Sequence, residues 1–150
     1  MSSKVLIDEF LSERTLAVVG ASRSGKKFGN AVMRELSSKG YTMLPVHPAA
    51  ADIAGVTCCK TVRDLPPSVG GVIIAVPPEQ TERVLEDVQK AGIRRVWLAQ
   101  GAESPAAIEY CEHQGIAEVH GECILMFAPE PVFIHKAHRF VRGVFGKLPQ

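Results

Sequence analysis

Short apolar stretches alternate with amphipathic stretches along most of the chain, and each apolar stretch runs into a glycine or a proline. The apolar stretches are nearly continuous, which is typical of strands buried on both faces of a parallel sheet. Between them, apolar residues recur every three to four positions, the spacing of helices that cover a sheet. The predicted strands lie within residues 15–20, 41–48, 71–78, 93–101 and 116–124, and the predicted intervening helices within 28–40, 79–92 and 104–115.

Residues at the ends of these helices support their limits. Gly40 and Gly92 follow the last apolar positions of two helices, where glycine often ends a helix. Ser104 precedes Pro105, a pairing typical of an N-cap and the first helical position. A short extended piece is also predicted at residues 56–58.

Two further helices are predicted near the ends of the sequence. The first covers residues 3–13, with Val5, Leu6, Phe10 and Leu11 on one apolar stripe. The second covers about residues 132–145 and contains His135 and His138 on one face.

The alternation of strands and helices along the chain predicts a particular fold. It indicates an α/β, Rossmann-like doubly wound architecture, with a mostly parallel five-stranded sheet and helices on both faces. The 150 residues are enough for one hydrophobic core, so residues 1–150 are expected to form a single domain.

Charge and composition exclude several classes of function. The 17 basic and 16 acidic residues give a net charge of +1, too small to attract nucleic acid or an anionic membrane surface. The N-terminal sequence lacks the uninterrupted apolar region of a secretory signal. Without an export signal, the four cysteines are expected to be reduced thiols in a cytoplasmic protein. They form no C-x-x-C motif, so no structural zinc is expected.

The turn after the first strand carries the clearest functional signal. Gly20 permits a sharp turn, and the residues that follow combine small hydroxyl side chains with positive charge next to the start of a helix. A diphosphate is the ligand that such a loop predicts, although a plain glycine turn with solvated lysines is the alternative. The candidate residues of this loop are Gly20, Ala21, Ser22, Arg23, Ser24, Gly25, Lys26, Lys27 and Gly29.

Two known phosphate-binding motifs fit this loop only partly. Lys27 stands where a P-loop places the serine or threonine that binds magnesium, which argues against an NTPase. Ser22 stands where the dinucleotide fingerprint has its middle glycine. The second strand ends at His47 rather than at the acidic residue typical of NAD sites. An NAD(P)-dependent oxidoreductase stays open as an alternative.

Five segments, taken together, resemble a known family. They are "AVVGASRSGKKFGN", "GYTMLPVHP", "VIIAVPPE", "VWLAQGAES" and "GECILMF", and the resemblance covers about residues 10–128. In order and spacing they are similar to the stand-alone CoA-binding proteins, which are themselves similar to the CoA-binding N-terminal domain of the succinyl-CoA synthetase alpha subunit.

The resemblance implies a coenzyme A site. It places the CoA pyrophosphate on the Gly20–Lys27 loop, the adenosine near the end of the second strand and the thiol near the Glu122–Cys123 turn. The remaining contacts that it implies come from Val46, His47, Pro48, Val76, Pro77, Pro78, Leu98, Ala99, Gln100, Gly101 and Cys123.

Three departures from the family pattern affect this expectation. Relatives often have asparagine in place of His47, and Ala49 and Ala50 replace a lysine that helps to hold the 3′-phosphate. Ile124 replaces a common proline. The phosphorylated histidine of the synthetase belongs to a second domain, so its chemistry is not carried over.

The residues themselves provide little support for catalysis. Cys123 is either a thiol that meets the CoA thiol or a small buried hydrophobe. His135 and His138 could join His120 or Cys123 in a metal site, but the arginines beside them favour a basic surface strip, and no metal is expected. We therefore expect no catalytic residues and a non-catalytic protein that binds CoA or an acyl-CoA. A small CoA-utilising enzyme remains an alternative, and a homodimer or a protein partner stays open.

Overall fold

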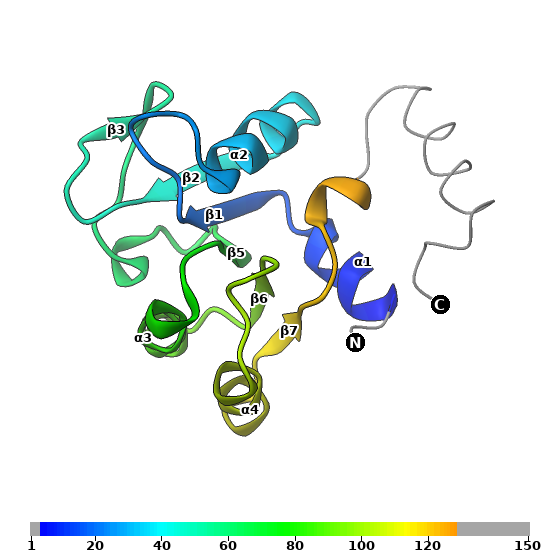
Figure 1. Ribbon diagram of the computed structural model, residues 1–150. Helices are drawn as coiled ribbons and strands as arrows, with labels where there is room; N and C mark the ends of the chain where they lie inside the picture. Colours follow the sequence, from blue (N-terminus) through cyan, green and yellow to red (C-terminus); the bar gives the residue numbers. More distant parts are fainter. Residues whose placement is uncertain (1–3, 129–150) are drawn as a thin grey trace.

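The computed structural model describes residues 4–128, which contain a sheet of five parallel strands (Figure 1). The strand order is β2-β1-β5-β6-β7, and every pair of neighbours is parallel. This confirms the predicted fold class. The strands are β1 (Thr15–Val19), β2 (Thr42–Val46), β5 (Gly71–Ile74), β6 (Arg95–Leu98) and β7 (Ala117–Val119).

Helices cover both faces of the sheet, and each face has its own apolar cluster. Leu16, Ile73 and Trp97 point from the strands into one cluster, and Val72 and Leu98 point into the other. The first face carries α1 (Lys4–Ser12), α2 (Phe28–Ser38) and η2 (Ile124–Met126); the second carries η1 (Val62–Asp64), α3 (Pro78–Ala91) and α4 (Pro105–Gln114).

The predicted helix ends are confirmed. The Ser104 hydroxyl accepts a hydrogen bond from the Ala107 N–H at 3.0 Å, as an N-cap does. Gly92, with φ of 77°, follows α3 in the left-handed conformation, and Gly40, with φ of 94°, follows the end of α2.

The apolar stripe predicted for the first helix is partly wrong. Ile7, Phe10 and Leu11 are the buried residues of α1, whereas Val5 is 65% exposed. Ile7, Phe10 and Leu11 are three or four positions apart and share one helix face, but Val5 lies more than half a turn from Ile7.

The extended piece predicted at residues 56–58 is one strand of a small hairpin. Strands β3 (Asp52–Ile53) and β4 (Val56–Thr57) pair antiparallel. The two residues between them, Ala54 and Gly55, have φ of 53° and 79°, as the common two-residue hairpin turn requires.

None of the helices in the described part of the chain is long and apolar enough to cross a membrane. The helix predicted at about residues 132–145, with His135 and His138, lies outside the described residues.

Candidate functional site

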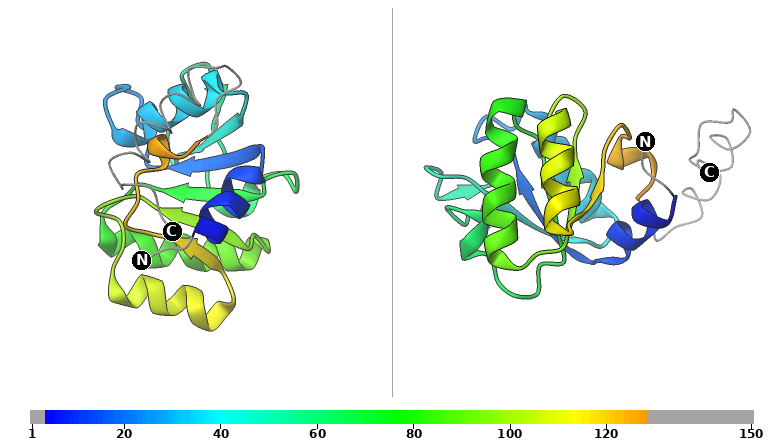
Figure 2. Two further views of the ribbon diagram at one scale, coloured as in Figure 1. Left: turned by 90° about the vertical axis from the view of Figure 1, so that its right-hand side faces the viewer. Right: turned by 90° about the horizontal axis from the view of Figure 1, so that it is seen from below.

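The carboxyl ends of all five strands lie at one edge of the sheet, because the strands are parallel (Figure 2). The chain leaves β1 toward β2 on one side and leaves β5 toward β6 on the other. The edge between β1 and β5 is therefore the topological switch point, where ligands bind in sheets of this kind.

Close backbone packing fixes the start of the loop after β1. Gly20 has φ of 125°, and a Cβ there would overlap the carbonyl oxygen of Ala75 at the end of β5. A Cβ at Gly29 would lie 2.7 Å from the Gly20 carbonyl carbon and from the Ala21 nitrogen. Glycine at position 20 lets the turn after β1 lie against the end of β5, and glycine at position 29 lets the first turn of α2 lie against that turn.

A buried asparagine holds the rest of the loop. Asn30 is only 4% exposed, and its Oδ1 accepts hydrogen bonds from the Ser22 N–H at 2.9 Å and the Lys27 N–H at 3.2 Å. Its Nδ2 donates to the Ser22 carbonyl at 2.9 Å. The bond from the Lys27 N–H fixes the residue that directly precedes α2. Asn30 was not predicted from the sequence; the available signal was a polar residue on the helix face that also carries the buried Met33.

The basic side chains of the loop face solvent. Arg23, Lys26 and Lys27 are all exposed. The turn beneath them is closed by the Gly25 N–H, which donates to the Ser22 carbonyl at 3.2 Å. The structure thus brings three positive side chains together beside the positive end of an eleven-residue helix, an arrangement suited to an anionic ligand.

Two pockets open beside this loop, and Phe28 lines both of them. The Phe28 ring is 41% exposed, although it is the first residue of a helix whose other large apolar side chains are buried. Phe28 was not among the site residues predicted from the sequence. The first pocket has a volume of about 240 Å³ and is lined by Phe28, Trp97, Ala99, Gln100, Glu122, Cys123 and Ile124. The second has about 220 Å³ and is lined by Phe28, Ala75, Val76, Pro77, Ala99, Gln100, Gly101 and Ala102.

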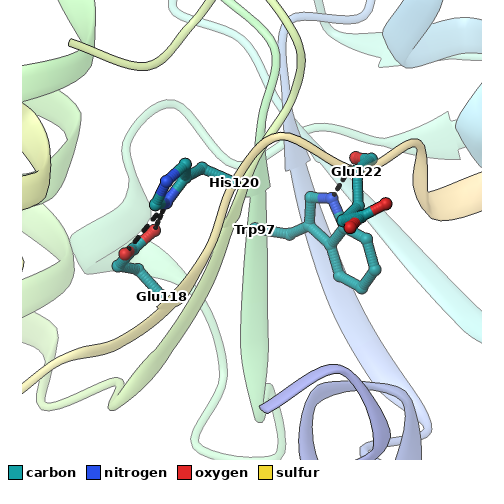
Figure 3. Close-up of polar contacts among 4 residues, drawn as sticks. All are labelled: Trp97, Glu118, His120 and Glu122. Carbon is teal, nitrogen blue, oxygen red and sulfur yellow. Dashed lines mark hydrogen bonds and ion pairs between the residues drawn. The ribbon is translucent and has the colours of Figure 1, made fainter. Parts of the chain in front are cut away.

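A buried tryptophan positions the far wall of the first pocket. Trp97 is completely buried, and its Nε1 donates to the Glu122 carbonyl at 3.0 Å (Figure 3). Its ring packs edge-on against Phe10, with 5.5 Å between centroids. Cys123 directly follows Glu122 in the sequence and is half-buried in the wall of the first pocket.

His120 faces away from this pocket. Its Nδ1 lies 2.7 Å and 3.0 Å from the two carboxylate oxygens of Glu118. Figure 3 shows this pair on one side of the chain and the side chains of Trp97 and Glu122 on the other. His120 is therefore not oriented to act as a base for a thiol at Cys123. The described residues contain no group of three side chains suited to a metal ion.

The other predicted site residues are divided between surface and core. Val76, Pro77, Ala99, Gln100 and Gly101 line the second pocket, as expected for residues on one edge. The Val46 and Leu98 side chains are 6% and 0% exposed, so they support the loops from below.

The end of β2 is organised by its histidine. The Nδ1 of His47 accepts hydrogen bonds from the Ala49 N–H at 3.0 Å and the Ala50 N–H at 2.9 Å. His47 thus closes the turn that contains Pro48, and its ring bonds to the chain's own backbone. Pro78, in contrast, is the first residue of α3.

The loop after β6 is tied to the helix that precedes the strand. The buried Thr81 hydroxyl donates to the Ala102 carbonyl at 2.7 Å. In the same loop, Glu103 Oε1 accepts from the Gly101 N–H at 3.3 Å. Its Oε2 is buried and has no hydrogen-bond donor among the described residues. This oxygen is therefore enclosed within the loop and is not exposed to a ligand in the second pocket.

Comparison with known families relates most of the chain to one of them. Residues 14–129 match the family described as "CoA binding domain". The chain belongs to this family. The match covers the whole sheet and all the loops of the site, and it confirms the resemblance found in the sequence.

Individual proteins with similar sequences include acetate–CoA ligases. The alpha subunit of the ADP-forming acetate–CoA ligase II of Pyrococcus furiosus is 32% identical over 143 residues, 93% of this chain and 31% of that protein. The chain spans between 12% and 31% of the length of the acetate–CoA ligases that it matches.

Solved structures show the same fold in small and large proteins. A conserved hypothetical protein from Pyrococcus furiosus is 36% identical with a TM-score of 0.71, and the match covers 75% of this chain and 97% of that one. The acetyl-coenzyme A synthetase 1 of Candidatus Korarchaeum cryptofilum is 26% identical with a TM-score of 0.62, covering 70% of this chain and 25% of that one.

Proposed function

We propose that this chain binds coenzyme A or an acyl-CoA across the carboxyl edge of its sheet and does not itself catalyse a reaction on it. The observation that carries the proposal is the continuity of the site. Phe28 directly follows the basic loop in the sequence and lines both pockets. One elongated ligand, anionic at one end and thiol-bearing at the other, matches this order of surfaces.

The phosphate end of CoA fits the loop after β1. Arg23, Lys26 and Lys27 supply charge, and the exposed position of all three leaves them free to meet phosphate oxygens. The Ser22 N–H is bound to Asn30, so it serves the loop rather than the ligand. The phosphates are then held mainly by side chains and by the start of α2.

The pantetheine arm fits the two pockets. It is a flexible chain with two amide groups, and the loop after β6 offers it the exposed amide of Gln100. The thiol end then reaches Cys123 in the first pocket. Thr81 holds this loop in place through its bond to the Ala102 carbonyl.

The end of β2 favours CoA over NAD. A carboxylate at this position binds the ribose hydroxyls of NAD. Here the His47 Nδ1 is engaged by the Ala49 and Ala50 N–H groups instead. This is the feature that separates the proposal from an NAD(P)-dependent oxidoreductase.

The proposal that the chain is not catalytic rests on how its reactive groups are placed. Burial, followed by the charges of Glu118 and Glu112, raises the pKa of the Cys111 thiol to about 12, so it stays protonated. His120 is paired with Glu118 on the side away from Cys123. A protein partner would supply any group transfer; the Pyrococcus furiosus relative is itself named as a subunit.

Calorimetric titration of the purified chain with CoA, dephospho-CoA, ADP and NAD tests this function. We expect CoA to bind most tightly, dephospho-CoA more weakly because it lacks the 3′-phosphate, and NAD more weakly still. Tighter binding of NAD than of CoA would overturn the proposal. Thiol release from acetyl-CoA above the buffer rate would overturn its non-catalytic part.

A further inference from the structure

We infer that the first pocket is an acyl site that accepts short uncharged acyl groups and rejects acyl groups ending in a carboxylate. This inference rests on the proposed binding of CoA and adds the class of acyl group. It draws on three observations: the shape and lining of the pocket, its place next to Cys123, and the carboxylate of Glu122.

The pocket is built as an apolar space. Trp97 and Ile124, which are 0% and 1% exposed, form its inner wall, and Phe28 and Ala99 lie beside them. Its volume of about 240 Å³ exceeds that of an apolar cavity of about 150 Å³ that takes up benzene in another protein. An acyl group of up to about six carbons would therefore find room and lose contact with water there.

The pocket lies where the acyl group would emerge from the ligand. It shares Phe28, Ala99 and Gln100 with the second pocket, so a pantetheine arm passing through the second pocket leads directly into the first. The Gln100 amide is exposed at this junction and can donate to a thioester carbonyl. The acyl chain would then continue past Cys123 toward Trp97 and Ile124.

Among the described residues of the lining, one side chain carries a charge, and that charge is negative. Glu122 belongs to the lining, whereas Arg23, Lys26 and Lys27 belong to the loop at the other end of the site. A terminal carboxylate on the acyl group would meet Glu122, and within residues 4–128 the lining contains no basic side chain to balance it. Butyryl and succinyl groups have the same number of carbons, so they separate the charge effect from chain length.

The architecture allows this charge to be removed without removing the support beneath it. The bond to Trp97 Nε1 is accepted by the main-chain carbonyl of Glu122, not by its carboxylate. The variant Glu122→Gln therefore keeps that bond while it neutralises the side chain. Glu82→Gln, on the exposed surface of α3, makes the same chemical change away from the pocket.

The first experiment measures dissociation constants of wild-type protein for CoA and for acetyl-, butyryl- and hexanoyl-CoA. We expect affinity to rise up to about fourfold for each buried methylene. Equal affinity for CoA and hexanoyl-CoA would overturn the acyl site and leave the proposed CoA binding intact. Failure of CoA itself to bind would overturn the proposed function and the acyl site with it.

The second experiment compares butyryl-CoA with succinyl-CoA. Wild-type protein should bind succinyl-CoA at least about tenfold more weakly, and this ratio should fall toward one in Glu122→Gln but not in Glu82→Gln. An unchanged ratio in Glu122→Gln would overturn the role of Glu122.

A third variant tests where the acyl chain of the ligand lies. Cys123→Leu fills the pocket wall, and we expect the ratio of CoA to hexanoyl-CoA dissociation constants to fall toward one. The matched change Cys58→Leu, on the small hairpin side of the molecule, should leave the ratio as in wild type. An undiminished ratio in a folded Cys123→Leu protein would show that the acyl chain lies elsewhere.

Discussion

The two ends of the site are built in different ways. At the phosphate end, the functional side chains are exposed and the backbone under them is held by Gly20, Gly29 and Asn30. At the pocket end, the lining side chains of Trp97 and Ile124 belong to the apolar core itself. Charge at the first end can therefore change with little effect on folding, whereas shape at the second end is coupled to stability.

The largest effect is expected at Gly20. The change Gly20→Val places a Cβ on the Ala75 carbonyl in a backbone conformation that valine avoids. The free energy of unfolding should therefore fall by at least about 3 kcal/mol, and ligand binding should be lost. Urea denaturation followed by calorimetry measures both. Gly25→Ala is the control: its φ is 77° but no atom lies within 4 Å of the added Cβ, so it should cost about 1–2 kcal/mol. Equal losses in the two variants would refute the close-packing argument.

Asn30 should come next. Asn30→Ala leaves the Ser22 and Lys27 N–H groups without their buried acceptor, which should lower the free energy of unfolding by about 2–3 kcal/mol and weaken CoA binding. Asn30→Asp keeps an acceptor for both groups but loses the bond from Nδ2 to the Ser22 carbonyl. Chemical denaturation should give wild type a higher free energy of unfolding than the Asp variant. The reverse order would show that the hydrogen bond from Asn30 Nδ2 to the Ser22 carbonyl does not stabilise the protein.

The exposed lysines should affect binding alone. The double change Lys26→Ala and Lys27→Ala should weaken CoA affinity at least about tenfold because charge-assisted contacts to phosphate are lost. The melting temperature should hardly change, since both side chains are exposed. Lys4→Ala with Lys90→Ala removes the same charge far from the loop and should leave the dissociation constant unaltered. A similar loss in both double variants would mean that only net charge matters.

The smallest effect is expected in the rates at which two cysteine thiols are chemically modified. Iodoacetamide should modify the half-buried Cys123 well before Cys111, whose pKa is raised to about 12 by burial and by two nearby glutamates. Peptide mass spectrometry over time gives the two rates, and saturating CoA should slow only the reaction of Cys123. Faster labelling of Cys111 would show that the α4 face opens more readily than the pocket.

Sequence reasoning succeeded where the signal is local. Strand hydrophobicity, the Ser104 cap and the glycine at 92 depend on neighbours within a few positions, and all are confirmed. Asn30 was missed because its partner Ser22 lies eight residues earlier in a loop whose path the sequence does not specify. Phe28 was missed because only the folded sheet brings residues 97–102 and 122–124 beside it. The direction of His120 likewise depends on the tertiary fold.

The first turn of α2 has a consequence for the kinetics of binding. Phe28, Gly29 and Asn30 are consecutive, and they respectively border the pockets, contact β1 and hold the loop. The same helix is anchored two residues later by Val32, which is completely buried. A site whose residues are held this directly by the core is preorganised, so binding the ligand costs little conformational entropy. Association should then follow a single rate that rises linearly with ligand concentration, without a slow closing step.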